Sequence, residues 1–201
     1  MNRLHGWICR SEKWRRTLGD RLPWVLSDAD LGSNLLELGP GPGLTTDLLR
    51  AKVDRLTAIE IDPKWAASLN SRVPGGNVKV VTDDATAMPF ADCRFSGGIC
   101  LTMLHHVPSR ALQDQLLREV WRVLEPGAPF VGCDSLLSVR MRIIHIGDTL
   151  VPSDPDTFGT RLEAAGFEVL KIEKRPETFR FHARRPRRAS TIATAPTVVG
   201  Q

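Results

Sequence analysis

The sequence predicts an α/β protein in which a mostly parallel β-sheet is covered by helices. Short apolar runs alternate with amphipathic stretches from residue 34 onward, which is typical of successive strand–helix units. The run at residues 97–101 is apolar throughout, as expected for a strand that is covered on both faces. Near the end of the chain, residues 167–172 and 178–183 are separated by too few residues for a parallel crossover, so they predict an antiparallel hairpin.

The elements follow one another in a regular order. Trp7, Trp14, Leu18 and Leu22 recur at helical spacing and predict one or two amphipathic helices, with a helix boundary at Pro23. Proline at residue 63 and serine at residue 109 are residues that start helices. The predicted strands are residues 34–38, 56–59, 78–81, 97–101, 130–133, 167–172 and 178–183, and the predicted helices between them are 45–51, 63–73, 109–124 and 155–165.

The chain length of 201 residues fits one domain with a short tail. We expect an N-terminal helical segment over residues 1–33, which covers the site, the main domain over residues 34–185, and a disordered tail over residues 186–201. No apolar run approaches the ~20 residues of a membrane span, and the N-terminus lacks the apolar core of a signal peptide. These features predict a cytoplasmic protein, and nothing in them indicates an oligomeric state.

The charge distribution and the cysteine spacing give little indication of a nucleic-acid, lipid or metal site. The net charge is +4, and much of the excess lies at residues 184–188, which we interpret as a solvated edge, with nucleic acid or anionic lipid contact as the alternative. The four cysteines show no C-x-x-C spacing, so the sequence predicts no metal site.

The stretch LLELGPGPG at residues 35–43 is the most informative part of the sequence. A buried strand runs into Gly39, Gly41 and Gly43, whose missing side chains let a ligand lie against bare backbone. A strand-to-helix turn of this kind binds nucleotides at the carboxyl ends of parallel strands. A dinucleotide fingerprint would require glycine where Leu44 stands, which disfavours an NAD(P) oxidoreductase.

Acidic residues follow the next two predicted strands. Glu60 ends the second strand, where a carboxylate can accept hydrogen bonds from both ribose hydroxyls. Asp62 precedes Pro63 and fits a helix cap instead. Asp83 and Asp84 follow the third strand, where either acid could accept a hydrogen bond from an adenine amino group.

Five segments in this order resemble the class I S-adenosylmethionine (SAM) methyltransferases, and in particular the methyltransferase type 11 family. They are the E-x-G-x-G-x-G loop, AIEIDP at 58–63, DA followed by MPF at 84–90, LTMLHHVP at 101–108 and EVWRVLEPGAPF at 119–130. The resemblance implies a Rossmann-like seven-stranded sheet of order 3-2-1-4-5-7-6, mostly parallel with one antiparallel strand and helices on both faces. It also implies SAM as cofactor and S-adenosyl-L-homocysteine as product.

The resemblance assigns roles position by position. Glu37, Gly39, Pro40, Gly41 and Gly43 would hold the methionine moiety. Around the nucleoside, Glu60 would bind the ribose, Ile61 would flank the adenine, and Asp84 with Ala85 would meet the adenine edge. Leu101 and Thr102 would line the cofactor floor, and Trp65 would either cover the adenine or pack in the core.

The acceptor is predicted from less specific features. We expect methyl transfer to an O, N or C atom of a small, partly apolar molecule, in a pocket shaped by the N-terminal helices and residues 135–154. His106 is the candidate catalytic residue, because a histidine can take a proton near neutral pH. His105 and His145 are further candidates, and each histidine could instead pack beside the cofactor.

Two other functions remain open. The segments 35–43 and 58–63 also resemble the rRNA adenine dimethylases, so RNA is the alternative acceptor. Those enzymes follow strand 4 with N-[LI]-P-[YF], whose aromatic ring stacks on a flipped base, whereas this chain has LTML at 101–104 and no tyrosine. A nucleic-acid partner is therefore the less favoured hypothesis. A protein that binds SAM without catalysis is the other alternative.

Overall fold

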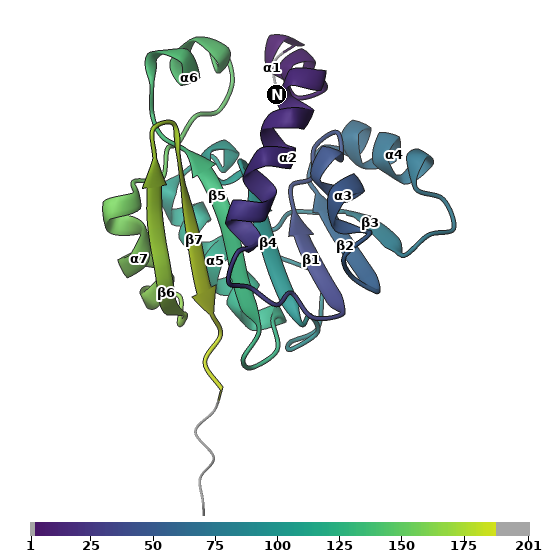
Figure 1. Cartoon of the computed structure of the whole chain (residues 1–201), viewed down its shortest axis with the longest axis vertical. Helices are drawn as coiled ribbons and strands as arrows, with labels where there is room; N and C mark the ends of the chain where they lie inside the picture. The colour runs from purple at the N-terminus through teal and green to yellow at the C-terminus, as the bar shows by residue number, and fades with distance from the viewer. Residues whose placement is uncertain (1–2, 188–201) are drawn as a thin grey trace, which may run out of the picture.

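The computed structural model describes residues 3–187, which form one seven-stranded sheet with helices on both faces (Figure 1). The strand order is β3-β2-β1-β4-β5-β7-β6, which confirms the order implied by the resemblance. β7 runs antiparallel to both of its neighbours, and the other pairs are parallel. The strands are β1 (Asn34–Leu38), β2 (Arg55–Glu60), β3 (Val78–Thr82), β4 (Gly97–Leu101), β5 (Pro129–Ser135), β6 (Glu168–Arg175) and β7 (Thr178–Arg184).

The helices form two layers and a set of short elements beyond the strand ends. One face of the sheet carries α2 (Glu12–Leu26), α3 (Leu44–Leu49) and α4 (Pro63–Arg72), and the other carries α5 (Arg110–Val123) and α7 (Pro155–Ala164). Figure 1 shows α1 (Arg3–Ile8) and α6 (Val139–Ile144) projecting beyond the carboxyl ends of the parallel strands. The 3-10 turn η1 (Leu104–His106) follows β4 at the same edge. These short elements surround the place where the sequence predicts the site.

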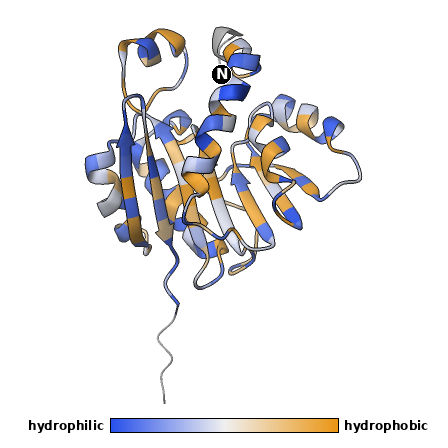
Figure 2. Cartoon of the chain, in the orientation of Figure 1, coloured by the Kyte–Doolittle hydropathy of each residue, from blue (hydrophilic) through white to orange (hydrophobic). Residues whose placement is uncertain are grey.

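Two cores explain why the central strands read as continuous apolar runs. Leu35 packs into the core under α2 and α3, while Leu36 and Leu38 pack into the core under α5 and α7, and all three are essentially inaccessible to solvent. Figure 2 shows hydrophobic residues concentrated on the central strands. Burial on both faces is the physical reason that these strands lack alternation.

The predicted helix boundary at Pro23 is wrong, because α2 continues through Pro23 to Leu26. Proline removes one backbone donor inside a helix, which is normally destabilising. Tertiary contacts beyond this point offset that cost. The buried Trp24 donates from its indole Nε1 to Glu173 at 3.0 Å, and the Arg175 guanidinium lies 4.1 Å from the centre of its ring.

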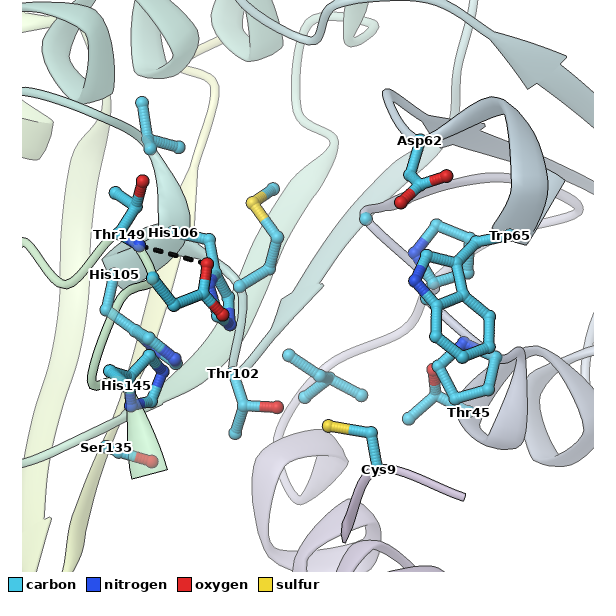
Figure 3. A pocket seen from close by; sticks show the side chains of 18 of the residues that line it. Cys9, Thr45, Asp62, Trp65, Thr102, His105, His106, Ser135, His145 and Thr149 are labelled. Carbon is cyan, nitrogen blue, oxygen red and sulfur yellow. Dashed lines mark hydrogen bonds between the residues drawn. The ribbon is translucent and has the colours of Figure 1, made fainter. Parts of the chain in front are cut away.

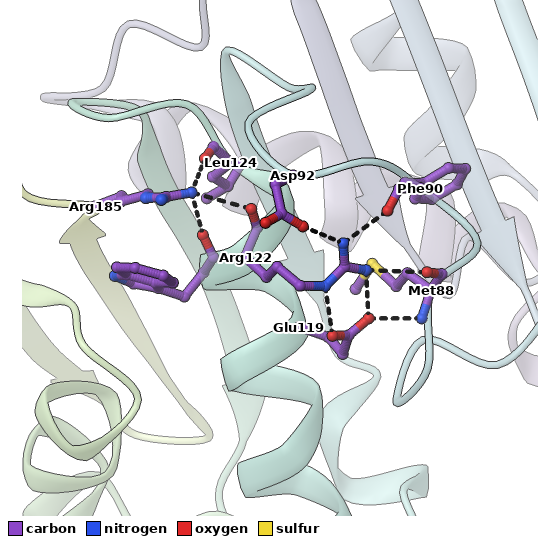
Figure 4. A network of polar contacts seen from close by, with 8 residues as sticks. Met88, Phe90, Asp92, Glu119, Arg122, Leu124 and Arg185 are labelled. Carbon is purple, nitrogen blue, oxygen red and sulfur yellow. Dashed lines mark hydrogen bonds and ion pairs between the residues drawn. The ribbon is translucent and has the colours of Figure 1, made fainter.

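Arg185 departs from the solvated edge that we expect for the basic cluster. Its guanidinium is buried, lies 3.9 Å from the centre of the Trp121 ring, and donates to the carbonyls of Trp121, Arg122 and Leu124 at the end of α5 (Figure 4). These carbonyls lack helical partners, so a cation there is stabilising. The remainder of the predicted tail, residues 188–201, lies outside the described residues.

The EVWRVL segment anchors the loop after β3. Arg122 pairs with Glu119 and Asp92 and donates to the carbonyls of Met88 and Phe90 (Figure 4). Glu119 in turn accepts the Met88 backbone N–H at 2.8 Å, and Arg122 lowers the pKa of this carboxyl. The network fixes residues 88–92 and thereby positions the loop that carries Asp84. Within residues 3–187, no helix is long and apolar enough to cross a membrane.

Candidate cofactor and acceptor site

A cavity of about 610 Å³ lies at the carboxyl ends of the parallel strands. This is the edge where the strand order reverses and ligands bind in open α/β sheets. Figure 3 shows two groups of side chains facing each other across it. We name them the glycine-loop half, lined by residues 39–42, 44, 45, 60–62, 65 and 83–86, and the histidine half, lined by residues from the segments 102–107 and 135–149. Residues from α1 and α2 also line the cavity.

The three glycines of the loop have positive φ angles but different surroundings. A Cβ on Gly39 would collide with the Met103 side chain, and a Cβ on Gly43 would collide with Leu69 and Arg72. A Cβ on Gly41 would meet nothing within 4 Å. Gly39 and Gly41 line the cavity, and Gly43 lies outside its lining. Gly41 therefore presents bare backbone to a ligand, whereas Gly43 is needed for packing.

Glu37 lies behind the loop rather than in the cavity lining. Its two carboxyl oxygens accept hydrogen bonds from the hydroxyls of Thr45 and Thr46 in the first turn of α3. Burial raises the pKa of Glu37 to about 7, against the opposing effect of the two threonine hydrogen bonds. The residue ties the strand end to the helix start and so holds the glycine turn in shape.

Glu60 lines the cavity, whereas Asp62 caps helix α4. Glu60 lines the cavity and accepts the backbone N–H of Gly41 at 2.8 Å and of Asp62 at 2.9 Å. Burial raises the pKa of this carboxyl. A carboxylate has about four acceptor positions, so these contacts leave Glu60 able to accept a further hydrogen bond from a ligand. Asp62 caps α4 by accepting the Lys64 N–H at 2.9 Å.

The adenine end that the resemblance implies is open to solvent. Ile61 is 66 % exposed, and Asp84 is exposed in a turn in which it accepts the Thr86 N–H at 2.8 Å. Both line the cavity with Ala85 and the half-buried Trp65. The Arg10 guanidinium lies 5.4 Å from the centre of the Trp65 ring, so the N-terminal segment reaches this end of the cavity.

Arg21 is a cavity residue that the sequence analysis does not single out. It comes from α2, and its Nη1 atom is buried with no hydrogen-bond partner among the described residues. Arg21 is half-buried overall, and its guanidinium lies 5.4 Å from the centre of the Trp14 ring. A buried donor atom that lacks a hydrogen bond is unfavourable, so Nη1 is a candidate contact for an anionic ligand group. The amphipathic helix pattern identifies α2, but it does not indicate that this arginine turns inward.

The histidine half brings together three imidazoles from two segments. His105 and His106 belong to η1, and His145 ends α6. Their ring centres are 4.3 Å apart for His105–His106 and 5.1 Å for each of the pairs with His145 (Figure 3). His105 and His145 are buried and His106 is half-buried. Burial, followed by smaller effects that include repulsion from His105, lowers the pKa of His145.

Asp134 is a second residue that the sequence analysis does not identify. It lies at the end of β5, fully buried, and its Oδ1 is 2.5 Å from His105 Nδ1. It also accepts the backbone N–H of His105 at 3.1 Å and of Ser135 at 2.8 Å. An acid at the end of an apolar strand was the signal used for Glu60, and the same signal is present in GCDS at 132–135.

Backbone contacts hold the histidine half in place. Thr102, a predicted floor residue with Leu101, has a φ of +50°, which is uncommon for a β-branched residue. Such strain persists where the surroundings impose it, often at functional sites. The Val151 N–H donates to the His105 carbonyl at 2.8 Å, and Gln113 donates to the carbonyls of Leu104 and Val151. Residues 104–106 and 151 are therefore fixed to each other and to α5.

The family model described as a methyltransferase domain matches residues 36–132. The chain contains a class I SAM-dependent methyltransferase domain. The match covers the glycine loop, Glu60, Asp84 and the segment after β4, and it ends in β5. The histidine-half residues beyond β5 lie outside the matched segment.

Curated relatives share shorter or partial matches with this methyltransferase domain. A ribosomal RNA small subunit methyltransferase A of Bordetella pertussis is 33% identical over 141 residues, which are 62% of this chain and 51% of that protein. A probable ribosomal RNA small subunit methyltransferase A of Haloarcula marismortui is 40% identical over 78 residues, which are 36% of this chain and 27% of that protein. The chain thus spans about half the length of these relatives, or less.

A solved structure shows the same fold over nearly the whole chain. The N-methyltransferase NodS of Bradyrhizobium japonicum, in complex with S-adenosyl-l-homocysteine, superposes with a TM-score of 0.70 at 18% identity, covering 90% of this chain and 91% of that one. SAM is the cofactor of such a domain, and the residues present here fit it. Gly41 leaves the loop backbone open, and Arg21 Nη1 offers a donor without a hydrogen-bond partner among the described residues, which suits a carboxylate.

Proposed function

We propose that this chain transfers a methyl group from SAM to an oxygen or nitrogen atom of a small, partly apolar acceptor. The observation that carries the proposal is the cavity itself. Its glycine-loop half has the groups for a nucleoside and an amino acid, and its histidine half is lined by both polar and apolar side chains. The covering N-terminal helices and the segment 136–149 enclose a volume suited to small molecules.

In this proposal four groups of the glycine-loop half and Arg21 of α2 bind the cofactor. The loop backbone at Gly39 and Gly41 receives the methionine portion, and Arg21 pairs with its carboxylate. Glu60 accepts hydrogen bonds from the ribose hydroxyls, and Asp84 meets the adenine amino group. Charge-assisted hydrogen bonds such as those of Arg21 and Glu60 are stronger than neutral ones, so these two residues should dominate affinity.

Methyl transfer requires mainly that the protein align the acceptor with the S–CH₃ bond of SAM. When bound, SAM supplies a methyl group that its sulfonium already activates. The cavity walls exclude water and hold the acceptor in line, which is a proximity and orientation effect. An acceptor that must lose a proton would meet His106, the least buried of the three histidines, while the Asp134 carboxylate fixes the His105 ring.

RNA is the second candidate acceptor. The relatives named as ribosomal RNA methyltransferases favour it, and the exposed Lys13 and Arg140 at the cavity could contact phosphates. Against it, the chain has LTML at 101–104, where the adenine dimethylases carry the N-[LI]-P-[YF] motif with its base-stacking aromatic residue. The enclosed histidine half is also better matched to a small molecule than to a flipped nucleotide on a duplex.

A labelling experiment separates the candidates. The full chain is incubated with methyl-labelled SAM and either the low-molecular-mass fraction of a host-cell extract or small ribosomal subunits. We expect label in the low-molecular-mass fraction and none in RNA. Label in 16S rRNA would establish the RNA alternative. If S-adenosylhomocysteine binds by calorimetry while no fraction becomes labelled, the chain is a SAM-binding protein without catalysis.

A further inference from the structure

The histidine half contains a group of side chains with the composition of a metal site. One ring nitrogen from each of His105, His106 and His145 lies within 4.8 Å of those of the other two. Figure 3 shows the three rings gathered on one side of the cavity, across from Trp65 and Asp62. The rings come from segments about forty residues apart in the chain, so their convergence results from the fold.

In two of the rings, Nδ1 is hydrogen-bonded to a protein oxygen, as is usual, in a metal-binding histidine, for the ring nitrogen that does not bind the metal. His105 Nδ1 lies 2.5 Å from the buried carboxylate of Asp134, and His145 Nδ1 lies 2.7 Å from the Met141 carbonyl. A carbonyl oxygen can only accept, so His145 Nδ1 carries the proton and Nε2 carries the lone pair. A carboxylate or carbonyl behind the ring is the usual support of a metal-binding histidine.

We propose that His105, His106 and His145 bind a divalent transition-metal ion at the end of the cavity. Three imidazoles suit zinc, iron, copper or nickel rather than magnesium or calcium. Three protein ligands leave a position that faces the cavity, as in catalytic rather than structural sites. Ligand nitrogens around zinc are about 3.3 Å apart at Zn–N distances of 2.0–2.1 Å, so the rings close on the ion by moving roughly an ångström.

This site differs from what the sequence predicts about metals. The sequence shows no recognised metal motif, and the expectation of no metal site followed from that absence. His105 and His106 are adjacent in the chain, and only the return of the segment after β5 brings His145 to them.

The role of the ion rests on the proposed function. As a metal ligand, His106 would not itself take the proton of the acceptor. An acceptor hydroxyl at the open position would instead lose its proton to solvent, because a divalent cation favours the anionic form. The oxygen lone pair then forms the new O–CH₃ bond, while the electron pair of the S–CH₃ bond returns to sulfur and gives S-adenosylhomocysteine. This inference narrows the acceptor to an oxygen compound such as an alcohol, phenol or enol.

Metal binding can be measured without any acceptor. The full chain, stripped with a chelator, is titrated with Zn²⁺ by calorimetry, and Co²⁺ spectra report whether thiolates participate. We expect one ion per chain and no thiolate charge-transfer band. His106→Asn should weaken binding at least tenfold, and Asp134→Asn should weaken it by about 10–100-fold. His182→Asn, which removes an imidazole from β7 outside the cluster, should bind as wild type does.

The same variants also give the results that would contradict the metal site. Unchanged Zn²⁺ affinity in His106→Asn and His145→Asn, or equal losses in His182→Asn, would overturn the site. Retained S-adenosylhomocysteine binding shows that each variant is folded. Undiminished methyl transfer in excess chelator would refute the role of the ion and leave the proposed function standing. Tight Zn²⁺ binding without any methyl transfer would support the metal site and refute the proposed methyl transfer.

Discussion

The two halves of the cavity are built in different ways. In the glycine-loop half, the residues that face the ligand belong to short contiguous segments, and many of the contacts are made by backbone: Gly41 N–H to Glu60, and Lys64 N–H to Asp62. In the histidine half, side chains from η1, α6 and the end of β5 converge, and the central contact joins His105 to Asp134. One half can be identified from local sequence, and the other exists only once the chain has folded.

The difference follows from what each half must recognise. A loop that binds the same cofactor needs one backbone shape, which a short run of glycines specifies. An acceptor pocket needs side chains at particular distances, which several chain segments can supply in many ways. Substitutions in and around the glycine-loop half test this division.

Gly41 and Gly43 test whether the loop is one functional unit. Gly41→Val should abolish S-adenosylhomocysteine binding in calorimetry while the protein stays folded, because the added side chain enters open cavity space. Gly43→Val should instead lower the melting temperature strongly, because its side chain would meet Leu69 and Arg72. Both variants also carry backbone strain of about 1–3 kcal/mol. Equal binding loss at unchanged melting temperature in both would show that Gly43 contacts the cofactor directly.

Glu37 tests whether the support behind the loop depends on pH. Its pKa is raised from 4.5 to about 7 in the folded protein, so the unfolded chain releases this proton first as pH rises. Stability from this group is therefore full below about pH 4.5 and falls by on the order of 3 kcal/mol as pH rises through 7. Denaturant unfolding at pH 5 and pH 8 should show this loss in wild type and much less of it in Glu37→Gln. The exposed Glu12→Gln serves as control, and a loss as large in Glu37→Gln as in wild type would assign the effect elsewhere.

Arg21 tests whether a residue outside the glycine-loop half also binds the cofactor, because it belongs to helix α2. A hydrogen bond to a charged group contributes about 1.5–3 kcal/mol, so Arg21→Ala should weaken S-adenosylhomocysteine by roughly 10–150-fold. Arg16→Ala, on an exposed position of the same helix, should leave the affinity unchanged. An Arg21→Ala variant with wild-type affinity would remove Arg21 from the cofactor site.

Glu60 and Asp62 separate ligand binding from helix capping within one segment. Glu60→Ala should weaken S-adenosylhomocysteine by about tenfold or more, because ribose acceptors and the Gly41 contact are both lost. Asp62→Ala should mainly cost about 1 kcal/mol of stability through loss of the α4 cap, which lowers the melting temperature by about 2–4 °C. A larger loss of affinity at Asp62 than at Glu60 would reverse the two roles.

The strand order, the glycine loop and the acids at the strand ends could all be predicted from the sequence, the strand order through the family resemblance. These features are local. A strand followed by glycines, or an acid after an apolar run, is enough to predict the backbone conformation of that segment and its position at the end of a strand. The resemblance extends this reading through the EVWRVL segment, whose Arg122 anchors the loop after β3.

Four features could not be predicted from the sequence: the continuation of α2 through Pro23, the burial of Arg185, the inward position of Arg21, and the proximity of His105, His106 and His145. Each depends on contacts between residues distant in the chain. Trp24 of α2 donates to Glu173 of β6, and Arg185 reaches the end of α5. Local propensity carries no information about such partners, because their burial and hydrogen-bond energies arise only when the layers pack together.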